Sequence, residues 1–257
     1  MAANRIDPVS ENQKMTDASS QPTQMKWDGE TIGRFWRWQA THPEQYFTNQ
    51  FGNRIAAALA PLLAGCKSVV DYGCGPGFLV PHLIGQGFEV SATDQSPEAL
   101  EAVAARCAGM PGFGRALPTD RLIAEGARFD GAIAIEVIEH LDDTHLEIFF
   151  DNLRALVNPG GLAIITTPND EQLANSDVYC PHCDHAFHRY QHMRSWSAAS
   201  LAASITQHGF NVQRSFTTDF SEPRFGDIKG KAKRIVKYLL GRPEKRPHLV
   251  CIARLPG

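Results

Sequence analysis

The chain contains 257 residues with a formal net charge of −3, and 43% of its residues are hydrophobic and 21% are charged. This length and composition predict a globular protein with one large domain and a complete core. The small negative charge argues against nucleic-acid binding over the whole surface, although a local basic patch is compatible with it. No apolar run approaches the about 18 residues that a membrane span needs, and the first residues lack the layout of a signal peptide.

The six cysteines are scattered, except for Cys180 and Cys183, which form a Cys-x-x-Cys pair. Scattered cysteines favour a reducing, cytoplasmic location over a disulfide framework.

The beginning of the chain divides into two segments. Residues 1–26 are polar and rich in Ser, Gln, Asn and Asp, which predicts a disordered leader. Residues 27–257 are expected to form a single domain. Its first part, 27–54, holds three of the four tryptophans and is predicted to be a helical cap. The aromatic rings of this cap either pack on the domain edge or wall a ligand pocket.

The remaining pattern alternates strands and helices. Strands are predicted at 69–72, 88–93, 113–117, 129–135, 162–167, 210–216 and 248–254. Helices are predicted at 55–63, from the Ser96 cap and Pro97 onward, at 146–157 and at 197–208. Such alternation indicates an α/β fold with a doubly wound, mostly parallel sheet.

The stretch 69–77 reads Val-Val-Asp-Tyr-Gly-Cys-Gly-Pro-Gly. It predicts a buried strand, a tight turn and a helix N-terminus, where glycines let the backbone approach a ligand. The next strand ends at Asp94, an acid well placed to accept hydrogen bonds from ribose hydroxyls. Any doubly wound nucleotide-binding domain is the alternative. An NAD-binding turn, however, usually has the spacing Gly-x-Gly-x-x-Gly.

This turn, followed by Asp94-Gln95-Ser96, resembles the class I S-adenosylmethionine-dependent methyltransferases. The resemblance implies a Rossmann-like sheet of seven strands with a late hairpin, and S-adenosylmethionine as cofactor. The predicted cofactor-binding residues are Asp71, Tyr72, Gly73, Cys74, Gly75, Gly77, Asp94, Gln95, Ser96 and Glu136.

A second motif, Glu136-x-x-Glu139-His140, follows the fourth predicted strand. If the chain is helical there, these three side chains share one face and can hold a divalent cation. The alternative is that Glu136 orients the substrate while Glu139 and His140 cap the helix. Together with His192, the motif is similar to those of two metal-dependent O-methyltransferase groups, one acting on the terminal 2′-hydroxyl of small RNAs and one in ubiquinone synthesis.

That resemblance implies that Glu136, Glu139, His140 and His192 bind Mg, Mn, Fe or Zn, and that the ion acidifies the acceptor hydroxyl. Glu136, His140 and His192 are the predicted catalytic residues. A histidine not bound to metal can instead serve as general base.

The Cys/His-rich insertion 179–192 belongs to neither of those groups. Its Cys-Pro-x-Cys knuckle predicts a zinc or iron site made by Cys180, Cys183, His185 and His188. The alternative is a reduced cysteine pair in a loop whose histidines reach into the active site. The segment is also similar to uncharacterised bacterial methyltransferases associated with surface-polysaccharide genes.

A basic helical insertion is predicted at 227–246, where eight Lys or Arg stand against one Glu between 229 and 246. It is either a solvated amphipathic helix or a docking patch for an anionic acceptor that is phosphorylated, lipid-linked or RNA.

The predicted function is O-methylation of a hydroxyl on a saccharide or other small metabolite, assisted by a divalent metal if one is bound. Two alternatives stay open. One is RNA terminal 2′-O-methylation, and the other is a metal-binding regulatory protein on an inactive methyltransferase fold. The sequence leaves the oligomeric state open.

Overall fold

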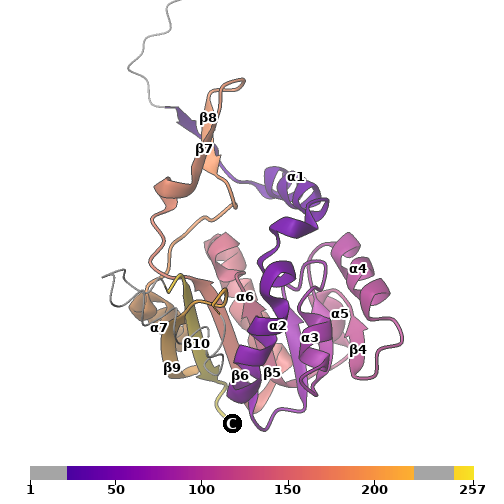
Figure 1. Cartoon of the computed structure of the whole chain (residues 1–257). Coiled ribbons are helices and arrows are strands. Elements are labelled where there is room, and N and C mark those ends of the chain that lie inside the picture. Colours follow the sequence, from indigo (N-terminus) through magenta and orange to yellow (C-terminus); the bar gives the residue numbers. More distant parts are fainter. Residues whose placement is uncertain (1–21, 223–245) are drawn as a thin grey trace, which may run out of the picture.

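The computed structural model of the chain describes residues 22–222 and 246–257, and its centre is a seven-stranded sheet (Figure 1). In spatial order the strands are β4 (Phe113–Ala116), β3 (Glu89–Thr93), β2 (Ser68–Tyr72), β5 (Phe129–Ile135), β6 (Val157–Pro168), β10 (His248–Arg254) and β9 (Asn211–Thr218). Strand β10 runs antiparallel to both neighbours, and the other pairs are parallel. The predicted α/β class and the late hairpin are confirmed.

Helices cover both faces of this sheet (Figure 1). One face carries α2 (Phe47–Leu59), α3 (Val80–Ile84) and α4 (Pro97–Cys107), and the other carries α5 (Thr119–Ala124), α6 (Asp143–Leu156) and α7 (Ala198–Gln207). Because side chains alternate along a strand, Val69 joins one apolar core and Val70 the other. Burial on both faces explains the nearly continuous apolar runs in the sequence.

The helix boundaries follow local capping signals. Ser96 Oγ accepts a hydrogen bond from Ala99 N at 3.1 Å and Pro97 occupies the first helical position, as predicted. Helix α6 begins earlier than expected, because the Asp142 side chain caps it by accepting from His145 N at 2.8 Å.

The aromatic segment 27–54 is mostly helical. It contains α1 (Gly29–Ala40), the 3-10 turn η1 (Pro43–Gln45) and most of α2, which η2 (Ala60–Leu63) extends. Further 3-10 turns are η3 (Ile138–His140) and η4 (Leu173–Ser176).

A small second sheet stands beside α1 at one end of the molecule (Figure 1). It consists of the hairpin β7 (Asp177–Cys180) and β8 (His185–His188), with β1 (Thr23–Gln24) paired parallel to β8. Backbone carbonyl groups along the edge of β8 accept hydrogen bonds from this strand: Thr23 N donates to Asp184 O at 3.1 Å, and Met25 N donates to Ala186 O at 2.9 Å. The last residues of the predicted leader 1–26 are therefore ordered as a strand, which corrects that boundary.

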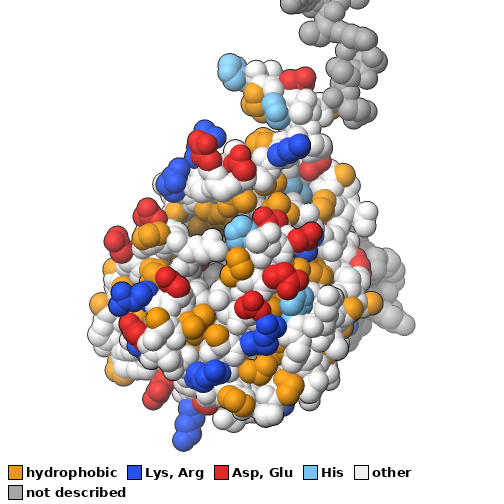
Figure 2. Space-filling view, turned by 180° about the vertical axis from the view of Figure 1, so that it is seen from behind, with side chains coloured by type: hydrophobic (Ala, Val, Ile, Leu, Met, Phe, Trp, Pro, Cys, Tyr) orange, Lys and Arg blue, Asp and Glu red, His pale blue; other side chains and the backbone are white. Residues whose placement is uncertain are grey.

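Two predicted segments fall outside the described residues. They are 1–21 of the leader and all of the basic insertion 227–246 except Arg246. Within the described ranges, each helix is too short or too polar to span a bilayer. Acidic and basic side chains are interspersed over the face shown in Figure 2.

Candidate active site

The glycine-rich turn leaves the carboxyl end of β2, where open α/β sheets bind ligands. Gly73, Gly75 and Gly77 have φ values of 70°, 50° and 72°, in the left-handed region that favours glycine. A Cβ atom on Gly77 would lie 2.5 Å from Val103 Cγ2, and one on Gly73 would lie 2.7 Å from Val137 Cγ2. Side chains thus enclose the turn closely, and its open surface is backbone.

Aromatic side chains cover the same turn. A Cβ atom on Gly75 would lie 3.3 Å from the ring of Tyr46, which packs 5.6 Å from the ring of Phe78. The Arg106 guanidinium lies over Phe78 at 4.3 Å. Burial, followed by the nearby charge of Asp94, raises the pKa of Tyr46 to about 12. Part of the aromatic cap therefore packs against the glycine-rich turn.

Two carboxyl groups flank the turn, that of the half-buried Asp94 and that of the buried Asp71. Asp94 Oδ2 accepts a hydrogen bond from Gly75 N at 2.8 Å, and Oδ1 accepts one from Ser96 N at 2.9 Å. Asp71, 3% exposed, lies in the neighbouring strand, and burial and then the charge of Asp94 raise its pKa to about 7.

Three other predicted cofactor-binding residues, Tyr72, Cys74 and Gln95, differ in how accessible their side chains are to a ligand. The Tyr72 hydroxyl accepts from Asn152 Nδ2 at 2.9 Å, and its ring packs edge-on against Phe149 on α6, so its side chain is already engaged. Cys74 is buried, and burial raises the pKa of its thiol well above the usual value. Gln95 is exposed beside the turn.

Glu136 follows β5 and has a φ of 54°, which is uncommon for a residue other than glycine. Thr166 on β6 holds it, since Thr166 Oγ1 donates to Glu136 Oε1 at 2.8 Å and Glu136 N donates to Thr166 O at 3.1 Å. The other carboxylate oxygen, Oε2, lies 3.4 Å from His248 Nδ1. Phe47 stacks on His248 with ring centroids 4.4 Å apart. Glu136 and His248 therefore form a pair at the ends of β5 and β10.

This placement corrects the prediction that Glu136, Glu139 and His140 share one helical face. The left-handed backbone at Glu136 breaks the helical register, and the 3-10 turn η3 begins only at Ile138. Glu136 consequently turns towards His248 rather than joining the other two side chains in one ligand set.

Glu139, His140 and His192 do come together, with one potential ligand atom of each within 4.8 Å of the others. His140 Nδ1 lies 3.3 Å from Gln191 O, and because a carbonyl oxygen only accepts, this nitrogen carries the proton. The lone pair is then on Nε2, which lies 3.9 Å from Glu139 Oε1. His192 Nδ1 lies 2.5 Å from Glu171 Oε2, so its Nε2 is likewise available.

The electrostatics of this cluster suit a cation. Glu139 is 1% exposed, and neither carboxylate oxygen has a hydrogen-bond partner among the described residues. Burial, followed by the charge of Glu136, raises the Glu139 pKa well above its usual range. Burial, followed by His192, lowers the pKa of His140 to about 3. A buried carboxylate without a partner is costly, and a bound cation would remove that cost.

The donor set therefore fits a divalent metal. One carboxylate and two neutral imidazoles form a common ligand set for Zn²⁺ and Fe²⁺, and such sites leave a position open for a substrate oxygen.

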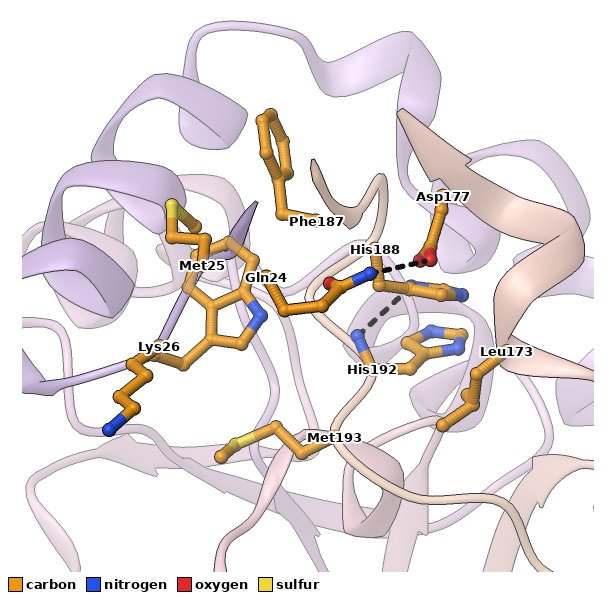
Figure 3. A pocket seen from close by; sticks show the side chains of 10 residues that line it. Gln24, Met25, Lys26, Leu173, Asp177, Phe187, His188, His192 and Met193 are labelled. Atoms are coloured by element: carbon orange, nitrogen blue, oxygen red, sulfur yellow. Dashed lines mark hydrogen bonds between the residues drawn. The ribbon is translucent and has the colours of Figure 1, made fainter. Parts of the chain in front are cut away.

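A cavity of about 510 Å³ adjoins this cluster beneath the hairpin (Figure 3). The residues on its walls include Trp27, Leu173, Phe187, His188, His192 and Met193. Figure 3 shows the rings of His188 and His192 one above the other on one side, with Met25 and Lys26 on the opposite side. The cavity combines apolar walls with polar groups and borders His192, which also belongs to the Glu139 cluster.

Comparison with known proteins decides the family. A family model described as "Methyltransferase domain" matches residues 36–215, which covers the sheet from β2 to β6 and most of β9. The chain belongs to the methyltransferase-domain family. Together with the seven-stranded sheet and the glycine-rich turn, this confirms a class I S-adenosylmethionine-dependent methyltransferase.

Curated relatives match only part of this methyltransferase. The ubiquinone biosynthesis O-methyltransferase of Methylobacterium nodulans is 34% identical over 111 residues, which cover 42% of this chain and 44% of the relative. The protein of the same name from Caulobacter vibrioides is 34% identical over 120 residues, 46% of each chain. The aligned stretch thus spans less than half the length of these relatives.

Solved structures share the fold over most of the chain. The 1,6-didemethyltoxoflavin-N1-methyltransferase of Burkholderia thailandensis has a TM-score of 0.61 at 19% identity and covers 92% of this chain and 94% of that one. A glycopeptide N-methyltransferase bound to S-adenosyl-L-homocysteine has a TM-score of 0.58 at 15% identity, covering 80% and 90%. At these identities the likeness concerns the fold.

The methyltransferase does not assemble the predicted Cys/His site in its hairpin. Cys180 and Cys183 are free, and His185 Nδ1 is 2.6 Å from the Cys183 carbonyl oxygen. His188 is 5% exposed and faces Glu171 instead. His185 and His188 are three residues apart in one strand, so their side chains point to opposite faces and cannot both join the cysteines.

Sequence reasoning missed several residues of the site. Glu171 and Gln191 contact the two imidazoles, Trp36 donates to Gln191 Oε1 at 3.0 Å, and His248 pairs with Glu136. Of these residues, only His248 could have been predicted from the sequence. Because the last strand runs antiparallel to β6, its first residue lies beside the carboxyl end of β6.

Proposed function

We propose that this methyltransferase transfers the methyl group of S-adenosylmethionine to a hydroxyl oxygen of a saccharide or other small metabolite, with a divalent metal at Glu139, His140 and His192. The observation that carries the proposal is the buried, partnerless Glu139 carboxylate, which faces His140 Nε2 at 3.9 Å. The names of the O-methyltransferase relatives support transfer to oxygen.

The chain's own residues supply binding and orientation. The backbone of the turn from Gly73 to Gly77 would hold the amino acid end of the cofactor, and Asp94 would accept hydrogen bonds from the ribose hydroxyls in place of its present bond to Gly75. Tyr46 would exclude water above the turn. Positioning of this kind supplies much of the rate of a group transfer.

The reaction also needs a way to remove the acceptor's proton. Glu136 and His248 form a proton-accepting pair beside the cofactor turn, and Thr166 fixes the carboxylate. A divalent ion at Glu139, His140 and His192 would act as a Lewis acid that makes the acceptor hydroxyl more acidic.

The cavity beneath the hairpin supports a small acceptor. Its volume of about 510 Å³ is in the range of small-molecule sites, and Trp27 and Phe187 line it beside polar groups. Aromatic faces combined with polar side chains suit a saccharide, which has both apolar C–H faces and hydroxyls.

The test is a methyl-transfer assay with labelled S-adenosylmethionine and a panel of saccharides, catechol-like phenols and a short RNA with a free terminal diol. The protein is purified without a metal-affinity tag, treated with chelator and refilled with Mg²⁺, Mn²⁺, Fe²⁺ or Zn²⁺. We expect labelling of a small hydroxyl compound that chelation abolishes and one metal restores. Glu139→Gln should abolish turnover but retain cofactor affinity, whereas Glu89→Gln, an exposed carboxylate on β3, should behave as wild type.

Other outcomes separate the alternatives. Full activity after chelation would contradict the metal role. If only the RNA is labelled, and periodate treatment of its terminal diol abolishes the labelling, then the acceptor is RNA rather than a small metabolite. Failure to bind S-adenosylmethionine would contradict the enzyme proposal and favour a regulatory protein.

A further inference from the structure

A second cluster adjoins the proposed metal ligands and shares His192 with them. Glu171, on the loop after β6, lies between two imidazoles: its Oε2 is 2.5 Å from His192 Nδ1 and its Oε1 is 3.3 Å from His188 Nε2. The two rings stack with centroids 4.4 Å apart and an interplanar angle of 22°. The side chains are mostly buried, with exposures of 17% for Glu171, 4% for His188 and 9% for His192.

The hydrogen bonds of His188 show that this cluster is unsuited to bind a metal itself. His188 Nδ1 accepts from Tyr190 N at 3.3 Å and from His192 N at 3.1 Å, so this nitrogen carries no proton. In a neutral ring the proton is then on Nε2, the nitrogen that faces Glu171. That nitrogen has no lone pair for a cation, but it can donate to the carboxylate. Glu171 therefore accepts the N–H of His192, while the Nε2–H of His188 lies 3.3 Å from its other oxygen without completing a hydrogen bond.

We propose that Glu171, braced by His188, is a positioning residue that holds His192 as its Nδ1–H tautomer and turns Nε2 towards Glu139 and His140. The role in metal binding rests on the proposed function, whereas the tautomer does not. In many metal sites a carboxylate accepts the N–H of a ligating histidine, which fixes the ring and raises its basicity.

The backbone around His192 supports this role. Met193 N donates to Glu139 O at 2.8 Å and Arg194 Nε donates to Leu141 O at 2.8 Å, which ties the segment after His192 to the chain around η3. His140 is oriented in the same way as His192, because its Nδ1–H points at Gln191 O. Both imidazoles thus have an acceptor at Nδ1, which leaves the lone pair of each neutral ring on Nε2.

The test uses the full chain with Glu171→Gln, and Asp170→Asn as the matched control. Asp170 is the adjacent, exposed carboxylate. Glutamine keeps the size of Glu171 but has one acceptor oxygen in place of the two that face His188 and His192. Two quantities are measured. One is the tautomer of His192 in the metal-free protein, from long-range ¹H–¹⁵N NMR correlations. The other is the dissociation constant for Zn²⁺ and for Co²⁺, with the Co²⁺ absorption spectrum as a report of ligand geometry.

We expect the Nδ1–H tautomer of His192 in wild type and in Asp170→Asn. In Glu171→Gln we expect a mixed or Nε2–H tautomer, a metal affinity weaker by about 10- to 100-fold and an altered Co²⁺ spectrum. His188→Asn gives a second variant, since asparagine can still accept the backbone N–H groups but lacks the Nε2 donor. It should shift the tautomer in the same direction to a smaller extent.

An Nε2–H tautomer of His192 in the wild-type protein would overturn the inference, and so would an unchanged tautomer in Glu171→Gln. If wild type binds no divalent metal, the metal part of the proposed function fails, but the tautomer still decides the role of Glu171. Conversely, Glu139→Gln should weaken metal binding and leave the His192 tautomer as it is.

Discussion

The carboxylate of Asp94 accepts a hydrogen bond from the backbone amide of Gly75 at 2.8 Å, so the end of β3 holds the glycine-rich turn that follows β2. One side chain thus shapes the turn, and we propose that the same carboxylate accepts hydrogen bonds from the ribose hydroxyls of S-adenosylmethionine. Asp94→Ala should therefore weaken cofactor binding by about 10- to 100-fold, because hydrogen bonds to a charged group contribute about 1.5–3 kcal/mol each. Isothermal titration calorimetry measures this affinity.

The control for that substitution is Asp120→Ala, which removes an exposed acid in the first turn of α5. It should leave the cofactor affinity unchanged. An unaltered dissociation constant for Asp94→Ala would remove Asp94 from the cofactor site.

Gly77→Ala should destabilise the fold for two reasons. Its φ of 72° strains any other residue, and the added Cβ atom would lie 2.5 Å from Val103 Cγ2. Strain and overpacking each cost about 1–3 kcal/mol, and we expect a loss of about 2–4 kcal/mol in the free energy of unfolding from urea titrations. Gly87→Ala is the matched control, because its φ is 94° but nothing lies within 4 Å of the added atom. Equal losses in the two variants would show that contact with Val103 is unimportant.

Asp71 should make the cofactor-free protein less stable as the pH rises towards neutrality. Its folded-state pKa is raised from 3.8 to about 7, first by burial and then by the charge of Asp94, so between these values the folded state binds more protons than the unfolded state. The contribution of this group to stability is present below about pH 4 and is lost as the pH approaches 7. The slope is at most about 1.4 kcal/mol per pH unit.

The measurement compares wild type with Asp71→Asn by urea denaturation from pH 4.5 to 8, without cofactor. Other buried groups titrate in both proteins, so the difference between the two curves isolates Asp71. We expect the stability of wild type relative to the variant to fall over this range. A constant difference would mean that Asp71 titrates normally in the folded state.

The parts of the structure that sequence predicted are those with local causes. The Ser96 cap, the glycine positions and the apolar strand 129–135 each carry their own signal, and the structure contains all of them. The position of Glu136 was predicted wrongly because its left-handed backbone conformation is held by Thr166, thirty residues away on β6. No short sequence pattern indicates such a conformation. Helical spacing is a sound guide only where the chain is helical.

The prediction of a zinc or iron site in the β7–β8 hairpin was wrong for a similar reason. Cys180 and Cys183 have the spacing of a zinc knuckle, but the alternation of β8 sends His188 to the opposite face, where Glu171 meets it. The partnership of Glu171 with His192 joins two loops that no periodicity relates. Three of the four predicted metal ligands nevertheless converge, because Glu139 and His140 are adjacent and the chain at His192 bonds to the backbone of Glu139 through Met193.

His248 offers the sharpest test of the proposed proton transfer. Its Nδ1 lies 3.4 Å from Glu136 Oε2, and Phe47 stacks on its ring, so the imidazole is held beside the carboxylate. His248→Asn should therefore lower kcat by about 100-fold or more, the usual contribution of a general base, and leave the affinity for S-adenosylmethionine and for metal within about twofold. His145→Asn, which alters a half-exposed histidine on α6, serves as control and should keep full activity. If His248→Asn loses cofactor affinity in proportion to kcat, the residue supports the binding site rather than the proton transfer, and Glu136 would have to accept the proton alone.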